Sequence, residues 1–406
     1  MIRFKLFLIL FYSSFLFGCS DAPKGPNPKD MSWAEIEEAA RDTNVNMLAW
    51  MGDAATNRYL EDFVAPRLLE DYGITIEFAS IAGPRIISFI MAEREAQKQT
   101  SEADMVWMAG RQSHQMRKLD ALYGPFTDLL PNSKYVVYQN LFVGFNNEIP
   151  LGGMEAPWGQ GQFLLITDKE RVPTPPQNMD ELEAWIMEHP GRFTFDPGFT
   201  TLSFLKILLV EVSGNRDVFS DEFNEDIYNE NSKKVWNFLN RIRPYMWREG
   251  KAFARSPAQL HQMFTNGEVD FSMSFNDRET DKKITQGVFP ETAYSFTWNS
   301  GTPKNATYLS IINNAPNKAG AMVVINFLIS PEAQLEKLSL EGMGDGSILE
   351  ADLLPTKWKD KFLAAQSRQY SPTQQVAEQK AFADLRPEYI TRLYNDFIKK
   401  FINASS

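Results

Sequence analysis

The sequence lacks most of the residues on which catalytic and metal centres depend. Its 406 residues include one cysteine and only three histidines, which lie far apart in the chain. A single cysteine excludes a disulfide within the chain, and no His-Glu-x-x-His or similar metal-binding spacing occurs. There is also no Walker loop, no Gly-x-Ser-x-Gly motif, no complete dinucleotide-binding glycine loop and no Tyr-Tyr pair. We therefore predict no metal site, no cofactor and no enzymatic activity.

Positive charge is scarce as well. The 41 lysines and arginines are outnumbered by 52 aspartates and glutamates, which gives a formal net charge of −11. Proteins that bind nucleic acids present a basic surface, so we expect no nucleic-acid partner. Two catalytic carboxylates can lie at any separation in sequence, so an envelope hydrolase, for example one acting on carbohydrates, remains an alternative function. A receptor without a transport role is the other alternative.

The N-terminus carries the pattern of a secreted lipoprotein. Arg3 and Lys5 precede the apolar run 6–17, which has the length of a secretory leader and is too short for a stable membrane span. The run ends at Gly18 beside Cys19, the only cysteine, and this junction resembles a bacterial lipobox. We predict a signal peptide over residues 1–18 and lipidation of Cys19, with an ordinary signal peptide or an uncleaved anchor as alternatives. The protein would then be tethered in the cell envelope, on its periplasmic or extracellular face.

A flexible tether is expected to follow the leader, over residues 19–32. The segment DAPKGPNPKD within it holds three prolines, one glycine and four charges. Such a composition cannot bury apolar area, so it favours a mobile linker.

The remaining chain alternates strand and helix patterns. Strands are predicted at 45–50, 74–78, 105–109, 163–166, 193–195, 269–275 and 308–312, and helices at 54–70, 84–91, 112–119, 179–189, 202–212, 256–267, 318–328 and 331–340. Residues 349–402 read as mostly helical. Alternation of this kind predicts an α/β protein with mostly parallel, doubly wound sheets, and the length predicts two domains.

Three long phrases give this order a family resemblance. LAWMGDAATNRYLEDF, ADMVWMAGRQSHQMRKLDALYG and APNKAGAMVVINFLISPEAQ resemble the opening strand, third strand and return of bacterial extracellular solute-binding proteins of ABC importers. Shorter phrases such as Glu155-Ala156-Pro157-Trp158-Gly159 and His189-Pro190-Gly191-Arg192-Phe193 resemble the YnjB-like subgroup. The resemblance implies a type II periplasmic binding fold, a monomer that closes around a small solute, and an ABC permease as membrane partner.

The same resemblance implies a division of the chain. We expect lobe 1 over residues 44–157 and 299–345, and lobe 2 over residues 158–298. Crossover strands would join the lobes and the ligand would bind in the cleft between them. Residues 346–406 would form a mostly helical segment that packs on the lobes.

Candidate ligand-binding residues follow from where strands end. In open parallel sheets ligands bind beyond the carboxyl ends of strands, where helix N-termini offer free N–H groups. This places the candidates in loops 50–54, 108–113, 196–201 and 275–277 and in the crossovers near 156–162 and 298–303. The predicted set is Trp50, Asp53, Arg111, Trp158, Phe199, Thr200, Asp277 and Trp298. Aromatic rings beside aspartate and threonine suit a polar organic solute with an apolar face, such as a sugar, a polyamine or a ring cation.

Most of these residues have a structural alternative. Trp50 fits the core as well as a pocket, whereas Trp158 and Trp298 stand among polar residues and glycines, which favours a pocket. Asp53 and Thr200 could only cap helices. Arg111 could lie solvated at the start of a helix, and Asp277 could close a turn.

Overall fold

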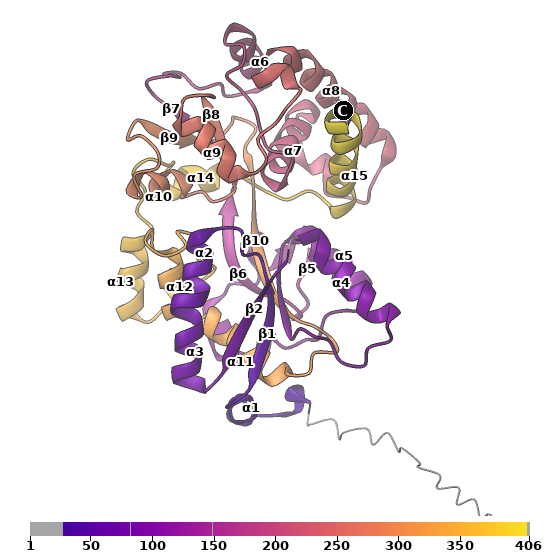
Figure 1. The fold of residues 1–406 in the computed structure, drawn as a ribbon, viewed down its shortest axis with the longest axis vertical. Coiled ribbons are helices and arrows are strands. Elements are labelled where there is room, and N and C mark those ends of the chain that lie inside the picture. Colours follow the sequence, from indigo (N-terminus) through magenta and orange to yellow (C-terminus); the bar gives the residue numbers. More distant parts are fainter. Residues whose placement is uncertain (1–26, 82, 148, 404–406) are drawn as a thin grey trace, which may run out of the picture.

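The computed structural model describes residues 27–81, 83–147 and 149–403, and it consists of two lobes stacked along the long axis (Figure 1). The predicted signal peptide, Cys19 and most of the predicted tether lie outside the described residues. The last part of the predicted tether does not behave as a linker. It contains the 3₁₀ helix η1 (Pro28–Asp30), in which Pro28 is buried, and Asn27 accepts a hydrogen bond from the Tyr123 hydroxyl of lobe 1. Local contacts with the body thus fix residues 27–32.

Lobe 1 is built on a mixed six-stranded sheet. Its order is β11-β10-β3-β1-β2, and β6 pairs with β10. The strands are β1 (Asn44–Ala49), β2 (Thr75–Ser80), β3 (Met105–Met108), β6 (Ala156–Gln162), β10 (Thr302–Ile311) and β11 (Ala381–Ala383). β1 runs parallel to β2 and β3, whereas β10 runs antiparallel to β3 and β6. A small hairpin, β4 (Phe145–Asn146) with β5 (Ile149–Pro150), lies beside this sheet.

Helices cover both faces of this sheet. They are α1 (Trp33–Ala40), α2 (Ala54–Arg58), α3 (Ala65–Tyr72), α4 (Gly83–Glu95), α5 (Gly110–Lys118), α11 (Lys318–Leu328), α12 (Pro331–Leu338) and α13 (Thr356–Ala365). Every residue of α11 after Lys318 is buried, as expected for a helix that is apolar on all sides.

The helix predicted over 54–70 is present, but its register changes midway. A π-helical stretch, η2 (Tyr59–Val64), separates α2 from α3. Pro66 is the second residue of α3, and because proline lacks an N–H and its ring clashes with the carbonyl four residues earlier, a wider turn is favoured before it. Gly73, at φ 68°, ends α3 in the left-handed conformation, as its sequence position predicts.

Lobe 2 has a smaller sheet than expected. Strands β7 (Leu164–Asp168), β8 (Phe271–Ser274) and β9 (Ala293–Phe296) pair in the order β8-β7-β9, and β7 is antiparallel to both neighbours. The chain enters lobe 2 along β7 and leaves it along β9, so these two must run in opposite directions. The strand predicted at 193–195 does not form, because the carbonyls of Phe193 and Phe195 accept hydrogen bonds from the loop amides of Trp247 and Ala254.

The lobe 2 sheet is enclosed by helices. These are α6 (Met179–Glu188), α7 (Phe199–Ser213), α8 (Glu225–Ile242), α9 (Pro257–Thr265), α10 (Glu279–Thr285), α15 (Pro387–Phe397) and the π-helical end η9 (Ile398–Ile402). The C-terminal helix α15 belongs to this core, which includes Tyr389, Leu393 and Phe397. None of the helices among the described residues has the length and apolar character needed to cross a membrane.

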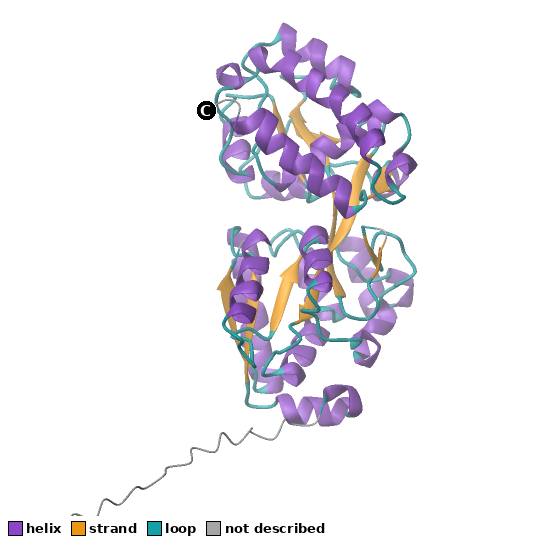
Figure 2. Ribbon diagram, turned by 90° about the vertical axis from the view of Figure 1, so that its right-hand side faces the viewer, coloured by secondary structure: helices purple, strands orange, loops and turns teal. Residues whose placement is uncertain are grey.

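Within the described residues, the chain passes between the lobes three times. β6 leads from lobe 1 into lobe 2, β10 returns, and Figure 2 shows these strands bridging the two lobes. The third passage is C-terminal: it runs from α13 through α14 (Gln374–Gln379) and β11 to α15. The expected fold class, α/β with two lobes joined by crossover strands, is confirmed, although only lobe 1 has parallel strand pairs at the centre of its sheet.

Candidate functional site

The carboxyl ends of β1 and β3 face lobe 2. Asp53, just beyond β1, has its Oδ2 3.8 Å from the Nζ of Lys282 on α10 of lobe 2. Arg111, at the start of α5 beyond β3, lies over the Tyr394 ring of α15, with its guanidinium carbon 5.2 Å from the ring centroid. The loops at these two strand ends therefore meet elements of lobe 2, as the predicted site requires.

Trp50 and Asp53 form the lobe 1 part of the site. The Trp50 side chain is 50% exposed, and its ring meets Trp107 edge to face at 6.4 Å. Trp50 is thus not a core residue. Asp53 caps α2, since its Oδ2 accepts hydrogen bonds from the amides of Ala55 and Thr56, both at 3.0 Å. The predicted cap is present, and the same carboxylate also faces Lys282.

Phe199 and Phe275 form the lobe 2 part. Phe199 is the first residue of α7, is 47% exposed and contacts Phe275 at 5.1 Å between ring centroids. Phe275 adjoins the hinge: a Cβ on Gly161 of β6 would lie 2.2 Å from its carbonyl oxygen, so only glycine fits there. Thr200 is buried in the first turn of α7, whose N-cap is Gly198 without a side-chain cap.

A buried ion pair lies beneath the two phenylalanines. The Lys206 Nζ is 2.8 and 2.9 Å from the two carboxylate oxygens of Asp384, and both residues are almost completely buried. The same Nζ lies 5.8 Å from the Phe199 centroid and 6.0 Å from the Phe275 centroid. Asn305 of β10 donates to Asp384 at 3.0 Å. The pair thus joins α7 to the hinge strand and to the C-terminal passage.

The two predicted pocket tryptophans are core residues, so this part of the prediction is wrong for the present conformation. Trp158 is fully buried in lobe 1, at 4.7 Å and 87° from Trp107. Trp298 is fully buried in lobe 2 against Phe204 at 5.6 Å. Trp158 lies within β6 and Trp298 in the connection between β9 and β10, and each large ring gains by entering the core of the lobe beside it. The glycines and polar residues beside them in sequence gave a misleading signal, because most of the residues around Trp158 in β6 are buried as well.

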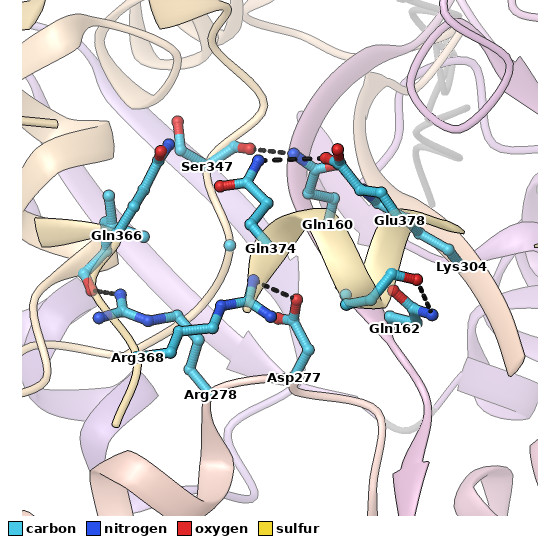
Figure 3. A pocket seen from close by; sticks show the side chains of 14 residues that line it. Gln160, Gln162, Asp277, Arg278, Lys304, Ser347, Gln366, Arg368, Gln374 and Glu378 are labelled. Atoms are coloured by element: carbon cyan, nitrogen blue, oxygen red, sulfur yellow. Dashed lines mark hydrogen bonds and ion pairs between the residues drawn. The ribbon is translucent and has the colours of Figure 1, made fainter. Parts of the chain in front are cut away.

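Asp277 belongs to a separate polar hollow beside the hinge, shown in Figure 3. Its carboxylate is 2.6 Å from the guanidinium of Arg368, which comes from the segment after α13. Arg278 also lines the hollow and is 3% exposed. Nothing in the local sequence indicates that these two arginines lie together, because only the tertiary fold brings residues 366–378 to the hinge. Trp50, Asp53, Phe199 and Phe275 do not line this hollow.

Lobe 2 also buries a polar cluster. The His261 Nδ1 is 2.7 Å from the Ser272 Oγ, and its Nε2 is 3.5 Å from the Glu279 Oε1. The order Ser–His–Glu resembles a hydrolase triad, but Ser272 is fully buried and no substrate reaches its hydroxyl in this structure. Burial raises the pKa of the nearby Asp196 carboxyl. The hydrogen bond that this carboxylate accepts from the Gly198 amide acts in the opposite direction and lowers the pKa.

Glu279 has the most strongly shifted carboxyl in this cluster. Burial by itself raises its pKa, but the hydrogen bond and charge of His261, together with Lys282 and Lys283, lower the pKa to about 2. The carboxylate is therefore ionised throughout the physiological range. No group of three or more potential metal ligands occurs among the residues that the structure describes.

The chain matches known proteins over most of its length. Residues 59–365 match the family described as bacterial extracellular solute-binding protein. YnjB of Escherichia coli (strain K12) is 32% identical over 327 residues, which cover 80% of this chain and 84% of that protein.

Solved structures share the fold at low sequence identity. A putative spermidine/putrescine ABC transporter protein from Listeria monocytogenes has a TM-score of 0.63 and 14% identity, and the match covers 88% of this chain and 98% of that one. The periplasmic binding protein AfuA from Actinobacillus pleuropneumoniae, with fructose-6-phosphate bound, has a TM-score of 0.61 and 14% identity. This match covers 89% of this chain and 99% of that one. The expected family, including its YnjB-like subgroup, is confirmed: the chain belongs to the bacterial extracellular solute-binding proteins.

Proposed function

We propose that this protein is a lipid-anchored solute receptor that closes its two lobes around a small polar organic solute and delivers it to an ABC importer. The observation that carries the proposal is the pair of exposed aromatic side chains, Trp50 on lobe 1 and Phe199 on lobe 2. Each is backed by a second ring and each stands at an element end that faces the lobe boundary. Large exposed rings in such places favour stacking against a ligand.

The chemistry of the surroundings indicates the solute class. Asp53 lies at the lobe 1 side, and the ammonium of Lys282 and the uncapped N-terminus of α7 lie at the lobe 2 side. Charged groups of both signs beside aromatic rings suit a polar solute that also has a flat apolar face. Spermidine/putrescine proteins and a sugar-phosphate protein share the fold, which is compatible with such ligands.

The hinge supports a closure mechanism. Strands β6 and β10 join two separate hydrophobic cores, so the lobes can rotate about the strands while each core stays intact. A solute that contacts both lobes binds the closed form more tightly than the open form, and it thereby shifts the protein toward the closed form. The closed form is the shape that an importer permease would recognise.

Solute binding is tested first with the mature protein purified without denaturation. Mass spectrometry of copurifying small molecules, followed by thermal-shift screening with metabolites, identifies the solute. We expect Phe199→Ala and Trp50→Ala each to weaken binding about tenfold or more while leaving the melting temperature of the free protein nearly unchanged, because both rings are exposed. Tyr245→Ala is the matched control, since this exposed aromatic lies in the 3₁₀ turn after α8. A well-folded protein that binds no metabolite would contradict the proposal.

The lipid anchor is tested separately. Cys19→Ser should release the protein from the membrane fraction of cells, whereas the wild type should stay with it and carry a lipid-sized mass increase on its N-terminal peptide. Equal membrane retention of both forms would contradict the anchor at Cys19 without affecting solute capture.

A further inference from the structure

Lys282 brings an ammonium group to the lobe boundary without a hydrogen-bond partner. It lies on α10 of lobe 2 and is 3% exposed, and no hydrogen bond from its Nζ occurs among residues 27–81, 83–147 and 149–403. The Asp53 carboxylate of lobe 1 is 3.8 Å away, which is an ion-pair distance but is too long for a hydrogen bond. All three N–H donors of this ammonium therefore remain for another acceptor.

Lobe 1 supplies much of the burial of Lys282. A Cβ on Gly344 would lie 3.0 Å from the Lys282 Cδ, so the side chain rests against the loop that follows α12. That loop belongs to lobe 1, because its neighbour Met343 lies in the lobe 1 core. The ammonium thus lies between two segments of lobe 1, and α2 and α10 face each other across the lobe boundary (Figure 1). Separation of the lobes exposes the ammonium to a solute, and closure buries it again.

Asp53 likewise keeps a free acceptor. Its Oδ2 accepts hydrogen bonds from the amides of Ala55 and Thr56 and from the Thr56 hydroxyl, whereas its Oδ1 has no hydrogen-bond partner in the described part of the chain. The side chain is 32% exposed. The exposed indole of Trp50 lies beside it, since a Cβ on the intervening Gly52 would be 2.5 Å from that ring.

The other acidic groups around α10 have partners of their own. Glu279 pairs with a histidine and a lysine of lobe 2, although the charge of Lys282 also lowers its pKa. Asp281 accepts hydrogen bonds from two backbone amides and a hydroxyl of the C-terminal passage. Asp345 is 3.3 Å from a buried lysine of α12. Asp53 is thus the acidic group that meets Lys282 across the boundary.

Two opposite charges that face each other across a closing cleft select the charge of the solute. A solute with a charge of one sign pairs with Asp53 or with Lys282 and draws it away from the other, which leaves one charge unpaired in the closed form at a high cost. A solute with both charges gives each of them a partner.

We propose that the solute is a zwitterion, whose cationic group binds the Asp53 carboxylate, whose carboxylate or other acidic group binds the Lys282 ammonium, and whose apolar part lies against Trp50. The inference rests on the solute capture proposed above and narrows its ligand to molecules that resemble amino acids or betaines. It also adds Lys282 to the solute contacts. The rule for strand ends does not find this residue, because it lies within a helix.

Thermal-shift titration of the mature protein with three charge classes tests the proposal. The classes are zwitterions (amino acids and betaines), cations (putrescine and spermidine) and anions (dicarboxylates and sugar phosphates). We expect the binders to be zwitterions. Derivatives that block one charge of the best binder, such as its amide or its N-acetyl form, should bind about tenfold more weakly or worse in calorimetry.

Two variants assign the charges to their partners. Lys282→Met should weaken binding of the zwitterion but not of its amide, which needs only Asp53. Asp53→Asn, which retains a good helix cap, should weaken binding of the zwitterion but not of its N-acetyl form. Lys283→Met is the matched control: it removes the same charge from the next residue of α10, whose ammonium is 3.5 Å from Glu279, and should leave the three affinities in their original ratios.

The outcomes separate this inference from solute capture itself. A best binder that carries charge of one sign only, or no charge, would overturn the inference and leave solute capture intact. Variants that weaken the zwitterion and both derivatives alike would also overturn it, because a merely structural role of the pair gives that result. A folded protein that binds no solute of any class would overturn both proposals.

Discussion

The buried pair of Lys206 and Asp384 offers the sharpest test of how the C-terminal passage is attached. Lys206→Met keeps most of the side-chain volume but leaves the Asp384 carboxylate buried, and among the described residues Asn305 and the Leu385 amide, both at 3.0 Å, are the donors that remain. Removing one partner of a buried ion pair costs about 3–5 kcal/mol of unfolding free energy. We expect a loss near the lower end of that range, because those two donors remain.

Urea denaturation followed by circular dichroism measures this loss. If the lobes unfold in separate transitions, the loss should fall in the transition of lobe 2, since α7 lies in its core. Lys234→Met is the control: Lys234 and Glu230 form an exposed i,i+4 pair on α8, and its removal should change the free energy by less than about 0.5 kcal/mol.

A double-mutant cycle decides whether the pair itself is responsible. Asp384→Asn alone should also destabilise the protein, because it leaves the Lys206 ammonium without its counter-charge. The double variant should be more stable than the sum of the two single losses predicts, by about 1–3 kcal/mol. Additive losses, or a Lys206→Met variant as stable as the control, would refute the reasoning from burial and distance.

Two further predictions concern the cores and pH. Trp158→Ala and Trp298→Ala should each destabilise the protein by about 3–5 kcal/mol, since both rings are fully buried, and thermal denaturation that shows either change to be neutral would contradict their core placement. Glu279 has a folded-state pKa of about 2 against 4.5 in the unfolded chain, so its contribution is present above pH 4.5 and is lost as the pH falls toward 2. Glu279→Gln should therefore lower stability at pH 7 by at most about 3 kcal/mol and flatten the pH profile below 4.5, measured by melting temperature; a profile as steep as that of the wild type would contradict the assignment.

Local signals predicted the secondary structure well where they were complete. The helix expected at 318–328 has those same bounds in α11, and Ser256 and Ser330 cap α9 and α12 through their side chains. Gly73 ends α3 where a left-handed residue is needed. In each case the residues that decide the structure are neighbours in sequence, so the pattern contains the cause.

The candidate site could be predicted only in part. Trp50 and Asp53 lie beyond the carboxyl end of β1 and face the lobe boundary, which follows from the rule for strand ends. Phe199 is exposed at the start of α7, although the strand predicted before it does not form. Trp158 and Trp298 were misplaced, because the sequence shows which residues surround a ring along the chain but not which core lies beside it.

The sequence by itself determined the helices that have clear caps or periodicity, such as α11, and the family, because hydrophobic periodicity, caps and recurrent phrases act over short distances. It did not predict α8, and the strand that it predicted at 193–195 does not form. The tertiary structure alone decided which charges meet. Lys206 and Asp384 are 178 positions apart, and Asp277 and Arg368 are 91 apart. The C-terminal passage brings these partners to the hinge, and the low dielectric of a buried site makes their pairing a large energetic term.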